Sequence, residues 1–201
     1  MALIVSDNRN CTGTLVNRNY VLTVASCIFN QNQRFVRLVN IYGGYKYYSV
    51  QEIYIHQLHK KYTNDIALLK LHEAVINIKP ICIWLNEDLK LESHMTFKAT
   101  DWNAIGRPTS NRINKFENRK CLNAFGKNPD QTQICAGYSN KDTCAELGSP
   151  LGIQISTNRY TLIGIQSYGA LGTCVYTNII KYIDWIVEVV LEVDVVFNKL
   201  Y

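Results

Sequence analysis

The sequence predicts an all-β fold, an antiparallel sandwich or barrel, that ends in one α-helix. Short runs rich in β-branched and aromatic residues alternate with clusters of Asn, Asp, Gly and Lys, as in strands joined by turns. The chain has 201 residues, 47% of them hydrophobic, which is enough for one large domain with a substantial core. Near the C-terminus the apolar residues change to helical spacing.

The predicted strands fall into two series. The first comprises residues 1–5, 14–16, 20–25, 35–42, 47–55 and 66–71, and the second comprises residues 95–100, 153–156, 160–167 and 174–177. Residues 79–84 lie between the two series and are interpreted as their connection. Such evenly spaced short strands are typical of all-β sandwiches and barrels.

The C-terminal segment is predicted to be an amphipathic helix over residues 179–196. Ile179, Ile183, Ile186 and Val190 recur at helical intervals. Residues 189–197 are crowded with valine, whose branched side chain also favours strands, so the end of this segment stays open between helix and strand.

The distribution of charged and apolar residues argues against a nucleic-acid partner and against a membrane span. The formal net charge is +5, but the basic residues are scattered in short clusters such as His59-Lys60-Lys61, so they indicate a solvated surface and no nucleic-acid partner. No run of eighteen apolar residues occurs, and we therefore expect no membrane span.

Seven cysteines indicate an oxidising, extracellular destination. Residues 1–5 are apolar, but the polar residues 6–10 end this run too early for a signal peptide. The two observations agree if the 201-residue chain is incomplete at its N-terminus, and that is our expectation.

The loop at residues 141–152 (KDTCAELGSPLG) resembles the active-site loop of trypsin-like serine proteases. In that family Asp-Thr-Cys leads into Gly-Asp-Ser-Gly-Gly-Pro, and the serine of this run is the nucleophile. Aligned from Cys144 and Pro150, the chain is one residue short, Glu146 takes the position of the aspartate and Leu147 takes that of the serine. A leucine has no group that can attack a carbonyl.

Further segments resemble motifs of the same family and follow in its order. They are residues 11–16 (CTGTLV), 20–27 (YVLTVASC), 64–69 (NDIALL), 100–103 (TDWN), 133–137 (QICAG), 164–169 (GIQSYG), 175–178 (VYTN) and 182–186 (YIDWI). Together they cover nearly the whole chain. The chain is therefore identified as a member of the trypsin/chymotrypsin-like family, resembling its non-catalytic arthropod homologues.

The resemblance implies two antiparallel six-stranded β-barrels with a C-terminal α-helix. Its boundaries are a first barrel over 1–80, a connection over 81–92, a second barrel over 93–178 and the helix over 179–196. Residues 1–5 look like the family's second strand, and the activation terminus Ile-Val-Gly-Gly is absent. We therefore expect the N-terminal strand of the first barrel to be missing.

The triad-equivalent positions are Ser26, Asp65 and Leu147, so only the aspartate of the family's triad is retained. Ser26 is too weak a base to replace the histidine, and the shortened loop is expected to distort the oxyanion hole. Without a histidine, Asp65 can accept backbone N–H bonds or the Ser26 hydroxyl. The resemblance thus implies an inactive homologue that works by protein binding, as a cofactor or decoy in an extracellular proteolytic cascade.

Two alternatives stay open. An active serine-type endopeptidase that cleaves after basic residues would need an unrecognised arrangement around Ser149 or Ser26. A degenerate or incorrectly assembled chain without function would fit the expected loss of a strand, because a barrel without one strand has an unpaired edge.

The substrate pocket that the resemblance implies contains Asp142, Ser167 and Gly169. Asp142 matches the acidic floor that prefers Arg or Lys, and is either a working ligand or an inherited carboxylate in a closed cavity. Residues 167–169 match the segment that pairs with a substrate backbone. Cys174 runs directly into Val175, where relatives have several residues that form the far wall, so a misshapen pocket is expected.

The resemblance also implies a disulfide pattern. It pairs Cys11 with Cys27, Cys121 with Cys135 and Cys144 with Cys174. Cys82 is left over, either bridged to a missing N-terminal segment or present as a buried free thiol.

No metal site and no cofactor are predicted. His56 and His59 are three residues apart on a strand-rich stretch, which places them on opposite faces, and no Cys, Asp or Glu completes a set. The expected partner is a protein, such as a protease, a zymogen or an inhibitor.

Overall fold

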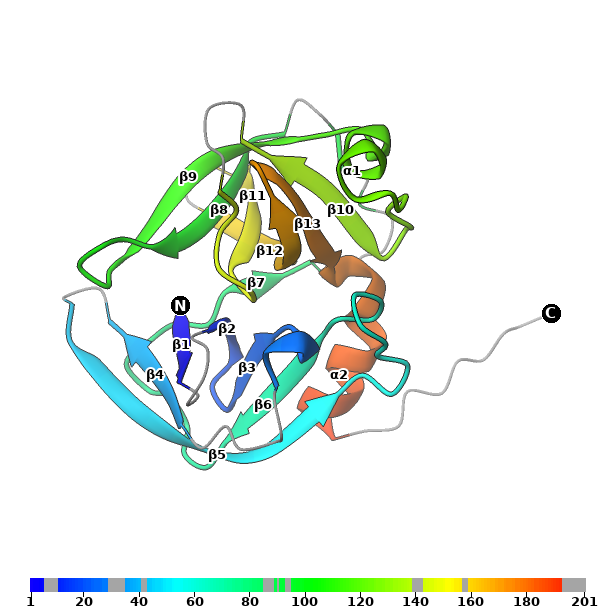
Figure 1. The fold of residues 1–201 in the computed structure, drawn as a ribbon. Helices are drawn as coiled ribbons and strands as arrows, with labels where there is room; N and C mark the ends of the chain where they lie inside the picture. The colour runs from blue at the N-terminus through cyan, green and yellow to red at the C-terminus, as the bar shows by residue number, and fades with distance from the viewer. Residues whose placement is uncertain are drawn as a thin grey trace.

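The computed structural model describes residues 1–5, 11–28, 35–40, 43–84, 89, 91–92, 95–138, 143–156 and 159–192. Two β-barrels lie one above the other, with the helix α1 (Asn118–Phe125) beside the second barrel and the helix α2 (Ile183–Leu191) beside the first (Figure 1). The strand connection between the barrels runs through β7 (Cys82–Ile83).

The first barrel is closed by six strands in the order β1-β2-β3-β6-β5-β4. These are β1 (Ala2–Val5), β2 (Cys11–Asn17), β3 (Tyr20–Thr23), β4 (Phe35–Val39), β5 (Tyr45–Ile55) and β6 (Ala67–Leu71). The expectation that this barrel lacks its N-terminal strand is wrong. Residues 2–5 pair with β2 along one edge and with β4 along the other, so they close the barrel themselves.

The second barrel also contains six antiparallel strands. They are β8 (Phe97–Trp102), β9 (Pro108–Lys115), β10 (Gln133–Gly137), β11 (Pro150–Ser156), β12 (Arg159–Ala170) and β13 (Thr173–Asn178). The ring closes because β11 pairs with both β8 and β12, and β7 adds in parallel to β12. The predicted fold of two six-stranded antiparallel barrels with a C-terminal helix is confirmed.

The core of the first barrel extends into the C-terminal segment. Ile179, Tyr182 and Ile186 are buried together with the barrel residues, and Leu162 and Ile165 of β12 join the same cluster. The helical spacing of the isoleucines is therefore explained by one buried face. A second cluster around Phe97 and Tyr176 fills the other barrel.

The C-terminal helix is shorter than predicted. Residues 179–182 form a 3₁₀ turn, η2 (Ile179–Tyr182), and the α-helix that follows ends at Leu191. Glu192 adopts a left-handed conformation with φ of 54°, and its N–H caps the helix by donating to the carbonyl of Glu188. Residues 193–196 of the predicted helix lie outside the described residues.

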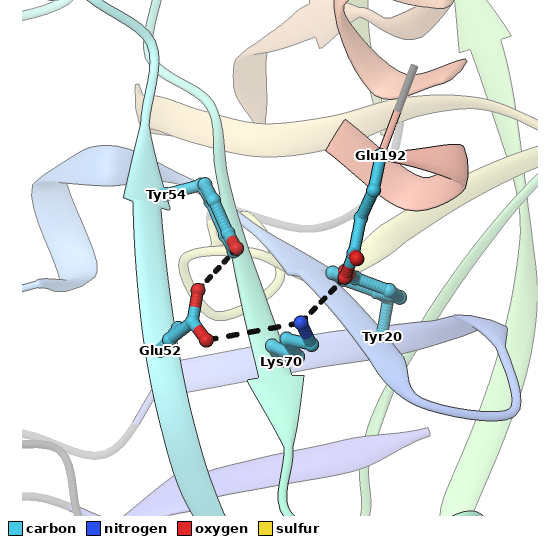
Figure 2. A network of polar contacts seen from close by, with 5 residues as sticks. All are labelled: Tyr20, Glu52, Tyr54, Lys70 and Glu192. Carbon is cyan, nitrogen blue, oxygen red and sulfur yellow. Dashed lines mark hydrogen bonds and ion pairs between the residues drawn. The ribbon is translucent and has the colours of Figure 1, made fainter. Parts of the chain in front are cut away.

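A polar network ties the end of α2 to the first barrel (Figure 2). Lys70 of β6 contacts Glu192 at 2.5 Å and Glu52 of β5 at 3.7 Å. Tyr20 of β3 donates to Glu192 at 3.2 Å, and Tyr54 of β5 donates to Glu52. The helix end is thereby linked to three strands of the barrel.

All three disulfides implied by the resemblance are formed, namely Cys11–Cys27, Cys121–Cys135 and Cys144–Cys174. The seventh cysteine, Cys82, is free and exposed, so the alternative of a buried thiol is wrong. Within the described ranges, every helix is too short or too polar to cross a bilayer.

Candidate functional site

Asp65 lies just before β6, and its side chain is almost completely buried, with 1% of the residue exposed. Its Oδ1 accepts the backbone N–H of Ser26 at 2.7 Å. Its Oδ2 accepts the hydroxyl of Ser26 at 3.0 Å and that of Ser167 at 2.5 Å. The prediction that Asp65 accepts bonds from Ser26 is confirmed, and Ser167 completes the group.

Burial raises the pKa of Asp65 above its usual value, because a charged carboxylate loses its hydration. The hydrogen bonds from Ser167 and Ser26 favour the charged form and oppose this shift. Ser26 lies in a short 3₁₀ turn, η1 (Ala25–Cys27), so the carboxylate holds this turn against β6 and β12. A hydroxyl at this position is too weak a base to take a proton from a nucleophile at neutral pH.

The loop that precedes β11 is fixed to both barrels. The carbonyl of Leu147 accepts the N–H of Thr12 in β2 at 2.8 Å, and the N–H of Gly148 donates to the carbonyl of Gln166 in β12 at 2.8 Å. The side chain of Leu147 packs against the core of the first barrel. The position that resembles the family's nucleophile therefore carries an aliphatic group used for packing.

Gly148 occupies a position that only glycine fits. Its φ is +79°, and a Cβ added there would lie 1.8 Å from the carbonyl oxygen of Thr12. A left-handed backbone and a close approach to β2 are thus both required at this residue.

Ser149 follows this glycine and is fully buried. Its N–H donates to the carbonyl of Glu146 at 3.0 Å, while its Oγ has no hydrogen-bond partner within the described part of the chain. A serine nucleophile needs a base in contact with its hydroxyl. The geometry around Ser149 does not supply one from the described residues.

Glu146 contacts the first barrel through Thr12. The hydroxyl of Thr12 donates to Glu146 Oε2 at 3.3 Å and accepts the indole N–H of Trp102 at 2.9 Å. Burial raises the pKa of Glu146, the nearby Asp101 raises it further, and the Thr12 hydroxyl opposes both effects.

The strands β12 and β13 form a hairpin with a two-residue turn, Leu171-Gly172, in which both residues have positive φ. The ladder continues to its tip, with Gly169 opposite Cys174 and Ala170 opposite Thr173. The ladder of β13 with β10 is also unbroken from Cys174 to Val175, so the residues that relatives have between these two positions have no counterpart in this chain.

Of the three predicted pocket residues, Ser167 and Gly169 are described, and both contact neighbouring groups of the protein closely. Ser167 is 1% exposed and its hydroxyl points to Asp65. A Cβ added at Gly169 would lie 2.4 Å from the Sγ of Cys144, so the disulfide packs directly against this glycine. Asp142 lies outside the described residues.

Gly169 also lines a cleft of about 630 Å³. Aromatic rings form one wall, where Tyr168 lies 4.7 Å from Tyr62 and 5.3 Å from Phe125 between ring centroids. The remaining lining residues are Lys60, Lys61, Thr63 and Lys127. We call this site the basic-aromatic cleft.

A comparison with protein-family models shows the family of this chain. The trypsin family model matches residues 1–186. The chain belongs to the trypsin family. This membership agrees with the order of motifs in the sequence and with the two closed barrels.

The trypsin-family relatives include proteases from arthropods and vertebrates. The chain is 27% identical to the proclotting enzyme of Tachypleus tridentatus over 89% of its length, and 28% identical to CLIP domain-containing serine protease B4 of Anopheles gambiae over 88%. It covers 58% and 61% of these two proteins. It is 29% identical to chymotrypsin-C of Bos taurus, with 88% of this chain and 76% of that protein covered.

Solved structures agree with the two-barrel fold of this chain. Kallikrein-related peptidase 10 superposes with a TM-score of 0.78 at 24% identity, covering 94% of this chain and 93% of that one. The same peptidase in a complex with Zn²⁺ gives a TM-score of 0.76 at 23% identity, with the same coverage. These likenesses support the fold alone.

Sequence reasoning missed the basic-aromatic cleft. Lys60 and Lys61 form a short basic cluster that by itself indicates a solvated surface, whereas Phe125 and Lys127 carry no motif. The fold brings them to the same site from more than sixty residues away along the chain. Only the resemblance of residues 167–169 to a substrate-pairing segment pointed to this region.

Proposed function

We propose that this trypsin-family chain is catalytically inactive and acts by binding another protein. The observation that carries the proposal is the state of Asp65, whose carboxylate accepts two hydroxyls and one amide from Ser26 and Ser167. In a catalytic triad this carboxylate orients the imidazole of a histidine. At the position of that histidine this chain has Ser26. Leu147 at the nucleophile position supports the same interpretation.

The buried Ser149 argues against the alternative of an active endopeptidase. Its hydroxyl contacts no base among the described residues, and Ser26 already donates its hydroxyl to a carboxylate. The closed first barrel and the three disulfides argue against a degenerate chain, because an incomplete barrel would expose an edge and part of its core.

The basic-aromatic cleft is the proposed binding site for the partner. Three lysines line this cleft, and the Nζ of Lys61 lies 5.3 Å from the ring centroid of Tyr62. An extended protein segment with acidic side chains fits this chemistry, since the rings offer apolar contact and the lysines offer opposite charge. The proposed partner is a protease, a zymogen or an inhibitor in an extracellular proteolytic cascade, and the disulfides are consistent with that location.

The absence of catalysis is tested with a fluorophosphonate probe, which labels activated serines. We expect no labelling at Ser26 or Ser149 and no cleavage of peptides after Arg or Lys, with an active trypsin-family peptidase labelled in parallel. Labelling of either serine, or cleavage that survives repeated purification, would contradict the proposal.

Binding is tested by immobilising the protein and measuring the capture of purified trypsin-family peptidases, their zymogens and protein inhibitors. A captured partner should bind about tenfold more weakly to the variant Lys61→Gln/Lys127→Gln, because two charged contacts are lost. The matched control is Lys98→Gln, which removes a lysine that lies over Tyr160 on the second barrel. Equal binding by both variants would place the partner elsewhere and reject the cleft.

A further inference from the structure

A second surface, on the outer side of the first barrel, combines an arginine with exposed aromatic rings. In the antiparallel pair of β4 and β5, Arg37 lies opposite Tyr47, and Phe35 lies opposite Ser49. Side chains of paired residues point to the same face, and alternation places Tyr45 on that face as well. We call Phe35, Arg37, Tyr45 and Tyr47 the outer aromatic face.

The three rings of this face are exposed to solvent. Tyr45 is 63% exposed, and Phe35 and Tyr47 are each 49% exposed. Tyr45 and Tyr47 contact edge to face, with ring centroids 5.8 Å apart. Single exposed apolar residues need no explanation, but three rings side by side on a sheet are typical of an interaction surface.

Arg37 lies beside Tyr45 and pairs with no acidic side chain among the residues that the structure describes. Its guanidinium carbon lies 5.4 Å from the centroid of Tyr45. It forms no ion pair with any described residue, and its Nε, shielded from solvent, has no hydrogen-bond acceptor there. The lysine next to Tyr45 in sequence, Lys46, is by contrast neutralised by Glu73 at 2.9 Å.

We propose that the outer aromatic face is a docking site for an acidic segment of a partner protein in which carboxylates alternate with apolar side chains. Arg37 would pair with a carboxylate through its free N–H groups, and stacking on Tyr45 orients its plane before binding. The rings of Phe35 and Tyr47 would cover the apolar side chains of the segment. An arginine flanked by aromatic rings is the typical centre of a protein interface.

This surface is separate from the basic-aromatic cleft. Figure 1 shows β4 and the beginning of β5 on the left of the molecule, whereas α1, whose last residue Phe125 lines the cleft, lies on the right. The proposal therefore stands on its own observations, and it holds or fails independently of the cleft.

The test uses a short fluorescent peptide in which Asp and Glu alternate with Phe and Leu, together with a second peptide in which every acid is replaced by Lys. We expect the acidic peptide to bind, with an affinity that falls as salt is added, and the basic peptide not to bind. Arg37→Gln should weaken binding about fivefold and Tyr45→Ser/Tyr47→Ser about tenfold, measured by fluorescence anisotropy.

Two controls keep the result specific. Lys98→Gln removes a cation that also lies over a tyrosine ring, that of Tyr160, and Lys61→Gln/Lys127→Gln removes two cations from the cleft. In either background, adding Arg37→Gln should still weaken binding of the acidic peptide about fivefold. The substituted tyrosines and the two cleft lysines are exposed, Arg37 and Lys98 are half-buried, and unchanged melting curves verify that every variant folds. The proposal is overturned if Arg37→Gln binds as tightly as the original chain, or if sedimentation shows that a second copy of the chain occupies this face.

Discussion

Ser26 and Asp65 are joined by two hydrogen bonds, one from the backbone N–H and one from the hydroxyl of the serine. The carboxylate fixes the turn η1 to the body of the first barrel and, through Ser167, to β12 of the second. Asp65 is thereby a structural link between the two barrels.

Removal of this carboxylate should destabilise the fold. Asp65→Ala leaves the amide of Ser26 and the hydroxyls of Ser26 and Ser167 without their acceptor, and buried donors without partners cost about 1–3 kcal/mol each. We expect a loss of about 2–5 kcal/mol in the free energy of unfolding, measured by urea denaturation. Ser26→Ala is the control, because it removes one donor and should cost about 1 kcal/mol. Equal losses in the two variants would contradict this structural role.

The raised pKa of Asp65 predicts a specific pH dependence. Between its unfolded and folded pKa values the native state binds more protons than the unfolded state, so this residue's contribution to stability falls as the pH rises through that window. Asp65→Asn cannot titrate and should lack this component. Denaturation curves from about pH 3 to about pH 7 should show the original chain losing stability relative to the variant as the pH rises. A constant difference would show that the folded pKa is not raised.

Gly148→Ala should be severely destabilising. The added methyl group would meet the backbone carbonyl of Thr12, and the left-handed φ adds strain. We expect a loss above about 3 kcal/mol or failure to fold. Gly126→Ala is a matched control, since that glycine has φ of +68° but no atom within 4 Å of an added Cβ, and strain alone costs about 1–2 kcal/mol. Thermal melts of both variants make the comparison, and similar losses would exclude the steric contact as the cause.

The disulfide between Cys144 and Cys174 should contribute more to the free energy of unfolding than the free thiol of Cys82 does. Its cysteines are 30 residues apart in sequence, so the bridge restricts the unfolded chain and should stabilise the fold by about 3–4 kcal/mol. Cys144→Ala/Cys174→Ala should lose about this amount in a denaturant titration. Cys82→Ser changes an exposed side chain and should stay within about 0.5 kcal/mol. A large loss in Cys82→Ser would mean that this thiol has a structural partner.

The network at the end of α2 can be followed through a tyrosine. The hydrogen bond to Glu52 raises the pKa of Tyr54 to about 12, with smaller contributions from burial and from the charge of Glu52. Because the folded state favours the protonated phenol, its contribution is present below the ordinary pKa and is lost as the pH rises to about 12. Glu52→Gln should move one tyrosine back toward its usual pKa in an alkaline absorbance titration. An unchanged titration would place the late-ionising tyrosine elsewhere.

The sequence predicts the strands of the first barrel well because each alternates or carries a continuous apolar run. It misses β9, whose residues are mostly exposed and polar, with Ile113 as its buried side chain. It also misses α1, a short helix in which only Cys121 is buried. Elements with one buried residue have no periodicity to detect, and their neighbours in the fold determine them.

The site was predictable in part. The motif positions identify Ser26, Asp65 and Leu147, and the acceptor role of Asp65 follows from hydrogen-bond chemistry. The third donor, Ser167, is about one hundred residues away from Asp65 in sequence and joins it only when β12 packs against the first barrel. The closing role of β1 was missed for a similar reason, since pairing on both edges depends on β4, which is distant along the chain.

The unbroken course of β13 from Cys174 to Val175 limits how this chain can change over evolutionary time. Substitutions at residues such as Ser26 and Leu147 can each be reversed by a change of one amino acid. The step from Cys174 to Val175 is different, because these residues pair with consecutive residues of β10 and no side-chain replacement adds backbone between them. A lineage that carries this unbroken strand can gain a loop there only through an insertion into its gene, so the missing loop is a more durable mark of the chain than any single substitution.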